Sequence, residues 1–450
     1  MFENIIAQAA SEQLKSDILS QRLAPSMLFF GPAASGKGSA AIELARAVSC
    51  DAGAPWNCAC SACVRHRALV HPDLAMIGPR SFASEIAASR AAFLRDSTSA
   101  APRSLFVRSL RKLLARFAPA VWEYEPKSGK LNPLSLLQPL EEEIDEFESL
   151  ASDETAAEKR ATLEKLTGSI IKNAFKLEDE CVSELIPIAQ VRRAAYWSRL
   201  SPSGKRKTLI IENADRMKDE ARNSLLKLLE EPPESINIIL TALRRESLLP
   251  TILSRVRPYR FLGRGAADER DIIRRIFRDP NAAADSTDAA SNLVSAYLDS
   301  FLPQPPEKLL PLAAFFNAAV ARAAAIYAKS QDSSYAGVSP ALKAIGSYCA
   351  SIAESAGFER SSDVKEVIAT LLSRSGNFEG RSFPRFLAYT LDLVSWSLNQ
   401  FVSGPARIAC SDIWRKHIDA AQSAYGVWNQ RPELALEALF HKLKRDMASI

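Results

Sequence analysis

The feature that most constrains the fold is a glycine-rich run, GPAASGKG, at residues 31–38. It follows a short apolar run, SMLFF at 26–30, which is typical of a buried strand. A helical sequence, AAIELARAV at 40–48, comes directly after it. Because a strand, a glycine-rich loop and a helix in this order form a phosphate-binding unit, the run predicts an α/β fold with a parallel sheet.

The glycine-rich run matches the pattern G-x-x-x-x-G-K-[ST] at every position but the last. In such a loop, backbone N–H groups and a helix N-terminus surround phosphates, and Lys37 is expected to reach the terminal ones. Gly38 stands where serine or threonine would ligate Mg²⁺, and Ser39 is one residue too late on the helix to point the same way. The loop therefore predicts that ATP or ADP can bind, while Mg²⁺-dependent hydrolysis has little support. An accidental glycine-rich turn is the alternative.

A second apolar run, TLIIENAD at 208–215, is the candidate strand that completes the nucleotide site. In such sites an acid at the strand end holds Mg²⁺ and the next acid orients the attacking water. Those places hold Glu212, which is longer than the usual aspartate, and Asn213, whose amide cannot act as a base. The alternative is a buried strand that merely ends in polar residues. The predicted nucleotide site comprises Gly31, Ser35, Gly36, Lys37, Gly38, Ser39 and Glu212.

Strands and helices alternate along residues 1–262, with one long interruption. From about residue 80 to residue 184 the sequence is charged and helical in period, which predicts a helical insertion into the α/β domain. Beyond Gly263, helical patterns recur and no run has the period of a strand. A chain of 450 residues suits two to four domains, so we expect the remainder to be all-helical.

One helix of the insertion is amphipathic. Its apolar face includes Leu105, Leu110 and Phe117. The opposite face holds Arg103, Arg108, Arg111, Lys112 and Arg116. Such a face could contact DNA or a partner protein, but solvated basic side chains on an amphipathic helix are the more common arrangement, and we expect them here.

Four of the seven cysteines lie close together, at Cys50, Cys58, Cys60 and Cys63. In a cytosolic chain this clustering predicts a metal site before it predicts disulfides, and four thiolates suit a closed, structural Zn²⁺ site. The C-x-C spacing is tighter than the common C-x-x-C, and a set of free buried thiols is the alternative. The histidines nearby, His66 and His71, are possible substitute ligands, although we expect His71 to shape the turn HPD at 71–73.

The composition is ordinary for a folded protein, with 47% hydrophobic and 24% charged residues. A net charge of +5 is too small to coat nucleic acid by charge alone, so any DNA contact should be local. The N-terminus is not that of a signal peptide, and no run of about 18 apolar residues occurs, so we expect a cytoplasmic protein without a membrane span. The four histidines have no serine or cysteine elbow nearby, so no catalytic triad is predicted.

Together these motifs resemble the bacterial clamp-loader family of AAA+ proteins, which serves DNA polymerase III. The matching segments are GPAASGKG, the cysteine module followed by HPDL, TLIIENADRM, NSLLKLLEEPP at 223–233 and TILSRV at 251–256. The insertion lies outside the family's usual pattern. The resemblance implies an AAA+ P-loop domain at 1–262 with a zinc module at 50–63 and the insertion at about 80–184, a helical lid at 263–305, and a helical collar for oligomerisation at 306–450.

Within that family, the resemblance is closer to delta-prime subunits than to the ATP-hydrolysing gamma/tau subunits. Delta-prime subunits are typically stators with an eroded nucleotide site, and they offer an arginine from a Ser-Arg-Cys motif to a neighbour's ATP site. The equivalent residues here are Ser254, Arg255 and Val256, so the resemblance implies that Arg255 is an arginine finger acting in trans. The implied partners are gamma/tau- and delta-type subunits and, through the complex, the sliding clamp and primed DNA.

Two other interpretations remain open. In one, the chain is a gamma/tau-like motor ATPase in which Ser39 and Glu212 replace the missing groups. In the other, it is an AAA+ factor of DNA repair or recombination. In the stator interpretation the chain has no useful ATPase activity of its own.

Overall fold

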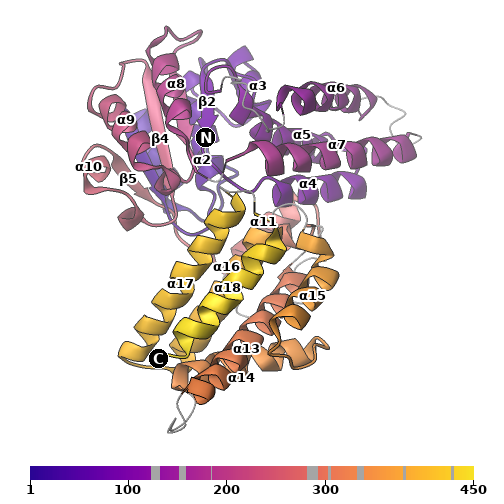
Figure 1. The fold of residues 1–450 in the computed structure, drawn as a ribbon. Coiled ribbons are helices and arrows are strands. Elements are labelled where there is room, and N and C mark those ends of the chain that lie inside the picture. The colour runs from indigo at the N-terminus through magenta and orange to yellow at the C-terminus, as the bar shows by residue number, and fades with distance from the viewer. Residues whose placement is uncertain are drawn as a thin grey trace. The chain divides into compact units, whose positions relative to one another are not determined.

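The computed structural model describes residues 1–122, 132–151, 159–183, 185–280, 292–302, 306–331, 339–378, 382–426 and 430–449. The chain forms two compact units, Met1–Leu302 and Pro303–Ile450, drawn in Figure 1. The division falls next to the predicted boundary between the lid and the C-terminal helical domain.

The first unit contains one parallel sheet. Its strands are β1 (Ser26–Phe30), β2 (Leu74–Ile77), β3 (Lys207–Ile211), β4 (Ile236–Ala242) and β5 (Arg257–Arg260). They pair in the order β2-β3-β4-β1-β5, and all four pairings are parallel. Strands β3 and β4 are buried along their whole length, as expected of strands covered on both faces. The predicted α/β class with a parallel sheet is confirmed.

The edge strand β5 was not predicted from the sequence. The strand is short, its sequence RPYR is mostly polar, and of its residues only Tyr259 is buried. Pro258 lacks a backbone N–H group and is tolerated because an edge strand needs hydrogen bonds on one side only. Pairing with β1, which places Met27 opposite Arg257, holds this segment in the sheet.

Helices cover both faces of the sheet. Alternate residues of the strands contribute to two separate cores, as the period of a strand requires. One core joins Leu28 and Leu209 to α8 (Ile188–Arg199) and α9 (Asp219–Glu230). The other joins Phe29 and Ile210 to α1 (Ala9–Leu19) and α2 (Lys37–Ser49). Two shorter helices, α3 (Ser61–Arg67) and α10 (Pro250–Leu253), lie in the connections.

The predicted insertion is helical in the part that the structure describes, although Glu184 lies outside it. Between β2 and β3 it contains α4 (Ala83–Arg95), α5 (Ala100–Leu114), α6 (Leu134–Ala151) and α7 (Arg160–Cys181). Figure 1 shows these helices side by side, and they share a core of their own that includes Phe93, Phe106 and Phe147. A further core joins α4 to α11 (Ala266–Ile276) and α12 (Leu293–Asp299), which end the first unit.

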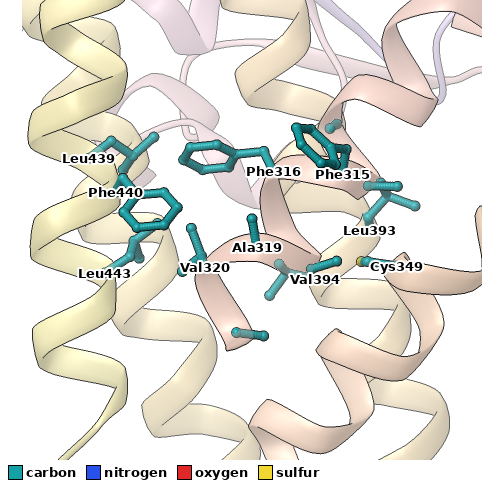
Figure 2. Close-up of a cluster of buried hydrophobic side chains, with 14 of the residues drawn as sticks. Phe315, Phe316, Ala319, Val320, Cys349, Leu393, Val394, Leu439, Phe440 and Leu443 are labelled. Atoms are coloured by element: carbon teal, nitrogen blue, oxygen red, sulfur yellow. The ribbon is translucent and has the colours of Figure 1, made fainter. Parts of the chain in front are cut away.

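The second unit is all-helical over its described residues. It consists of α13 (Pro306–Gln331), α14 (Pro340–Ser355), α15 (Val364–Ser375), α16 (Ser382–Phe401), α17 (Pro405–Gly426) and α18 (Pro432–Met447). Figure 2 shows Phe316 and Val320 of α13 pointing toward Phe440 and Leu443 of α18. Helix α13 is long and apolar enough to cross a membrane, but 72% of its apolar window is buried inside this unit, as expected of a core helix.

Candidate functional site

The glycine-rich loop leads from β1 into α2, and Lys37 is the first residue of that helix. Gly36 precedes it with a φ of 92°, a left-handed conformation that glycine adopts without strain. The buried Lys37 Nζ donates hydrogen bonds to the carbonyl oxygens of Gly31 at 2.6 Å and Pro32 at 2.5 Å, and to Ser35 Oγ at 3.3 Å. The lysine therefore folds back on its own loop, where an incoming anion would compete with these oxygens.

A second cation, Arg264, lies against the same loop. Its Nη1 donates to the carbonyl oxygen of Ala34 at 2.7 Å, and a Cβ at Gly36 would lie 2.7 Å from its Nη2. Burial lowers the pKa of Lys37 to about 8, Asp215 opposes this shift, and Arg264 adds to it. Lys37 is thus still mostly protonated at neutral pH.

Gly38 faces the residue that follows β3, Glu212. A Cβ at Gly38 would lie 2.9 Å from Glu212 Oε1, which is closer than atoms in van der Waals contact approach. A serine or threonine hydroxyl therefore does not fit at this position unless the carboxylate moves. Gly38 and Glu212, which both depart from the usual residues of a nucleotide site, are therefore direct neighbours.

Glu212 is held by side chains of the insertion. Arg80 Nη1 lies 3.2 Å from Glu212 Oε1, and Arg116 Nη2 contacts Oε2. Arg80 also pairs with Glu85 at 2.5 Å, and Glu85 pairs with Lys112. These five side chains, which we call the arginine–glutamate network, connect α4 and α5 to the end of β3.

The network keeps its carboxylates ionised. Burial alone would raise the pKa of Glu212, but Arg80, Arg116 and Lys112 outweigh burial and hold that pKa below its ordinary value. Lys112 and Arg80 likewise lower the pKa of Glu85 to about 2 against the effect of burial. Both acids therefore carry a full negative charge at neutral pH.

Asn213, in the predicted place of the water-orienting acid, has a structural role instead. Its backbone is left-handed, with a φ of 49°. Its Nδ2 donates to the carbonyl oxygen of Pro79 at 2.7 Å, and its backbone N–H donates to Thr241 Oγ1 at 3.1 Å. The amide thus ties β3 to the start of the insertion and to β4, and it cannot take a proton from water.

The residues at this corner do not fit a Mg²⁺ ion. Magnesium prefers a near-octahedral set of oxygen ligands. Gly38 offers no side-chain oxygen, and both oxygens of Glu212 are engaged by guanidinium groups. Neither place that the phosphate-loop pattern assigns to the metal provides a free ligand.

The four predicted cysteines meet in one cluster beside α2. Their sulfurs all lie within 4.8 Å of one another, with 3.6 Å between Cys50 and Cys58 and 3.9 Å between Cys50 and Cys60. Cys63, in the first turn of α3, completes the group. Four thiolates bound at about 2.3 Å to one tetrahedral zinc ion lie about 3.8 Å apart. The cluster therefore has the size needed to hold one metal ion.

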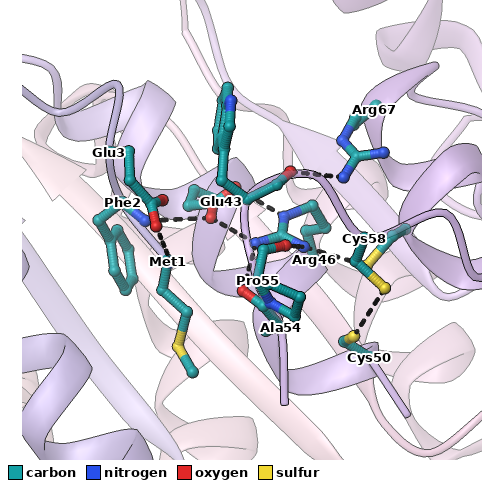
Figure 3. Close-up of polar contacts among 12 residues, drawn as sticks. Met1, Phe2, Glu3, Glu43, Arg46, Cys50, Ala54, Pro55, Cys58 and Arg67 are labelled. Carbon is teal, nitrogen blue, oxygen red and sulfur yellow. Dashed lines mark hydrogen bonds and ion pairs between the residues drawn. The ribbon is translucent and has the colours of Figure 1, made fainter. Parts of the chain in front are cut away.

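Arg46 of α2 lies beside the cysteine cluster, and Figure 3 shows it with Glu43, Ala54, Cys50 and Cys58. Its Nη1 donates to Cys63 Sγ at 3.0 Å, and its Nη2 donates to the carbonyl oxygen of Ala54 at 3.0 Å. Glu43 binds the same guanidinium through both carboxylate oxygens, at 2.9 and 2.7 Å, and this pairing raises the pKa of Arg46 above its ordinary value. A permanent cation beside a sulfur favours the thiolate form that a metal binds.

The two histidines near the cluster stack on each other. The ring centroids of His66 and His71 are 4.0 Å apart, with 11° between the ring planes. Neither belongs to the group of four sulfurs, which reaches four possible ligands without a histidine. His71 Nδ1 accepts a hydrogen bond from the backbone N–H of Asp73 at 3.1 Å, which confirms its predicted role in the HPD turn.

Arg255 lies on the surface just after α10. Its Nη2 pairs with Glu230 Oε1 at 2.7 Å, and its Nη1 donates to the carbonyl oxygen of Thr251 at 2.7 Å and to Ser254 Oγ at 3.1 Å. The Arg255 side chain is 32% exposed. An ion pair with this exposure contributes about 0–1 kcal/mol, so the pair holds Arg255 only weakly.

The prediction of a solvated basic face on α5 is wrong at the end of that helix. Lys112 and the residue just beyond α5, Arg116, are buried and bind Glu85 and Glu212. Sequence reasoning also missed Arg80 as a site residue. Because β2 pairs in parallel with β3, residues that follow these two strands meet at one edge of the sheet, and this was the available signal.

Comparisons with known proteins agree with the motifs. The family model for "DNA polymerase III, delta subunit" matches residues 6–114 and 149–264, which together make up half of the chain. The delta' subunit of DNA polymerase III from Pseudomonas aeruginosa is 38% identical over 82 residues, 18% of this chain and 25% of that one. The match thus spans about a quarter of the relative's length.

One solved structure that is similar is a DNA polymerase III gamma subunit-related protein from Thermotoga maritima. It is 15% identical, and the alignment covers 97% of this chain and 99% of that one. The TM-score is 0.30. The family model, which includes the glycine-rich loop, the cysteine cluster, β3 and Arg255, therefore identifies the chain as a member of the DNA polymerase III delta subunit family.

Proposed function

We propose that the chain is a delta-prime-like stator of the DNA polymerase III clamp loader, the complex that uses ATP to load the sliding clamp onto primed DNA. The observation that carries this proposal is the arginine–glutamate network. A chain that keeps the family's motifs, but whose Glu212 is bound to Arg80 and Arg116, lacks the means to hydrolyse ATP itself. The gamma/tau-like motor interpretation is disfavoured by the same contacts.

In this role the chain supplies Arg255 in trans to the ATP site of a neighbouring motor subunit. A guanidinium beside the γ-phosphate stabilises the charge of the transferring group, and its loss costs about 10³-fold or more at one site. Glu230 holds Arg255 on the surface of the free chain. In the complex, the phosphate replaces Glu230 as the partner of Arg255, and the weak surface pair opposes this exchange only slightly.

The cysteine cluster is proposed to hold one structural zinc ion. Cys50, Cys58, Cys60 and Cys63 would bind it as thiolates, in a closed set without an open position for a reaction. Burial raises the pKa of Cys63 to about 12 in the metal-free chain, so binding the ion would displace a proton from this thiol. The ion would fix the loop between α2 and α3.

The partners would be gamma/tau- and delta-type subunits in the cytoplasm, with the clamp and DNA reached through the complex. Copurification tests this directly. The affinity-tagged chain, expressed in the organism that encodes it, should copurify with gamma/tau- and delta-type subunits. The isolated chain should show negligible ATP turnover with DNA and clamp present. Recovery of recombination or repair proteins in place of polymerase III subunits would contradict the proposal, as would turnover that Lys37→Ala abolishes.

A further inference from the structure

We propose that Arg80 and Arg116 take the place of Mg²⁺ at the glycine-rich loop, so that the loop binds the diphosphate group of a nucleotide without a divalent cation. The inference deepens the proposed function, because it names what the non-hydrolysing site still binds. It requires neither assembly of the complex nor Arg255.

The position of Arg80 carries the first step of the argument. Its Nη1 lies 3.8 Å from the place of a Cβ at Gly38, where the usual loop has the hydroxyl that ligates the metal. Glu212 Oε1 lies nearer still, 2.9 Å from the same place, and its carboxylate is held by Arg80 and Arg116. Guanidinium groups thus lie beside the corner where the usual loop binds a divalent cation.

The charge around the loop favours an anion. The side chains that act electrostatically on Lys37 and Glu212 are basic at Arg80, Lys112, Arg116 and Arg264 and acidic at Glu85 and Asp215. With Lys37 and Glu212 themselves, five positive charges face three negative ones. Arginine also suits phosphate in geometry, because its planar fork donates two hydrogen bonds to adjacent oxygens.

Donors remain available for such a ligand. Arg116 is 3% exposed, yet its Nε and Nη1 have no hydrogen-bond partner within the described residues. Burying guanidinium donors without acceptors is costly, and an anion near this corner would reduce that cost. Arg80 is 24% exposed, so solvent and small ligands can reach it.

Magnesium should therefore not assist binding. A nucleotide complexed with Mg²⁺ carries less negative charge than the free nucleotide, and Glu212 has no oxygen left for the ion. In the usual loop the ion links phosphate to protein, so binding there depends on it. An affinity that Mg²⁺ raises is thus expected of the usual loop, and an affinity that Mg²⁺ does not raise is expected of this one.

Isothermal titration of the full chain with ADP, in EDTA and in excess Mg²⁺, tests the inference. We expect saturable binding in EDTA that Mg²⁺ does not strengthen. Arg80→Gln should weaken ADP binding in EDTA about tenfold or more, because it removes a charge-assisted contact. The control Arg111→Gln, which removes an arginine of the same insertion that pairs with Glu148, should leave the affinity unchanged.

Absence of ADP binding in both buffers would overturn the inference, and so would an affinity that Mg²⁺ raises tenfold or an Arg80→Gln affinity equal to that of Arg111→Gln. Circular dichroism checks that each variant is folded. Failure here would leave copurification with clamp-loader subunits intact, so it is separable from failure of the proposed function.

Discussion

Replacing Glu212 by glutamine should release the insertion from the end of β3. The substitution keeps the size of the side chain but removes its charge. Arg80 and Arg116 then lose the carboxylate that both contact, and Arg116 is left as a buried cation without an acid bound to it in the described residues. We expect the contacts between the insertion and the sheet to open more often.

The magnitude follows from the burial of the network. Removing one partner of a buried ion pair costs about 3–5 kcal/mol. Glutamine retains an oxygen that accepts one hydrogen bond, so we expect the lower end, about 3 kcal/mol. Since 1.36 kcal/mol is a factor of ten, the open state should become roughly a hundredfold more populated.

Native-state hydrogen exchange of α4, α5 and β3 measures this population. The matched control is Glu148→Gln, which breaks the half-exposed pair with Arg111 and should cost at most about 1 kcal/mol. Exchange rates in Glu212→Gln that resemble those of Glu148→Gln would refute the claim that Glu212 anchors the insertion.

Three further predictions concern metal, pH and the loop. Protein purified without chelator should contain about one zinc ion per chain; Cys60→Ser should lower this content and Cys349→Ser, a buried thiol of the second unit, should not, whereas equal contents would argue against the four-cysteine site. Because Glu85 and Glu212 have lowered pKa values, their contribution to stability is complete above about pH 4.5 and should be lost as pH falls toward about 2. The protection of α5 from hydrogen exchange in the wild type should then fall toward that of Glu212→Gln, and wild-type protection that stays well above that of the variant at low pH would count against this. Gly38→Ser should lower the unfolding temperature and restore no ATPase activity, because its Cβ would lie 2.9 Å from Glu212 Oε1; steady turnover by this variant would show that the corner accepts a metal.

The sequence was sufficient for the parts of the fold that depend on local patterns. The apolar runs at 26–30 and 208–215 contain β1 and most of β3, and the amphipathic pattern of the insertion corresponds to α5. The cysteines were close enough in the chain for their clustering to be visible from spacing alone. In contrast, β5 was missed because its residues are stabilised by pairing with β1 and not by their own apolar character.

At the glycine-rich loop, the sequence revealed which positions are eroded but not which side chains replace the missing groups. Gly38 and Asn213 could be recognised as departures from a pattern, but what replaced the missing groups depends on contacts between distant segments. Arg116 and Glu212 are 96 residues apart in the chain. Charge on an amphipathic helix looks the same in sequence whether it faces solvent or a buried carboxylate, so Arg116 was assigned to the wrong environment.

The most direct test of the account is the ATPase rate of a reconstituted clamp loader that carries Arg255→Ala in this subunit. The variant should fold and assemble, since the Arg255 side chain is partly exposed and its pair with Glu230 is weak. We predict that its ATPase rate with DNA and clamp falls, because one motor site loses its trans arginine. The control Arg274→Ala, an exposed arginine paired with Asp271, should keep the full rate. Equal rates and equal clamp loading for Arg255→Ala, Arg274→Ala and the wild type would contradict the stator function.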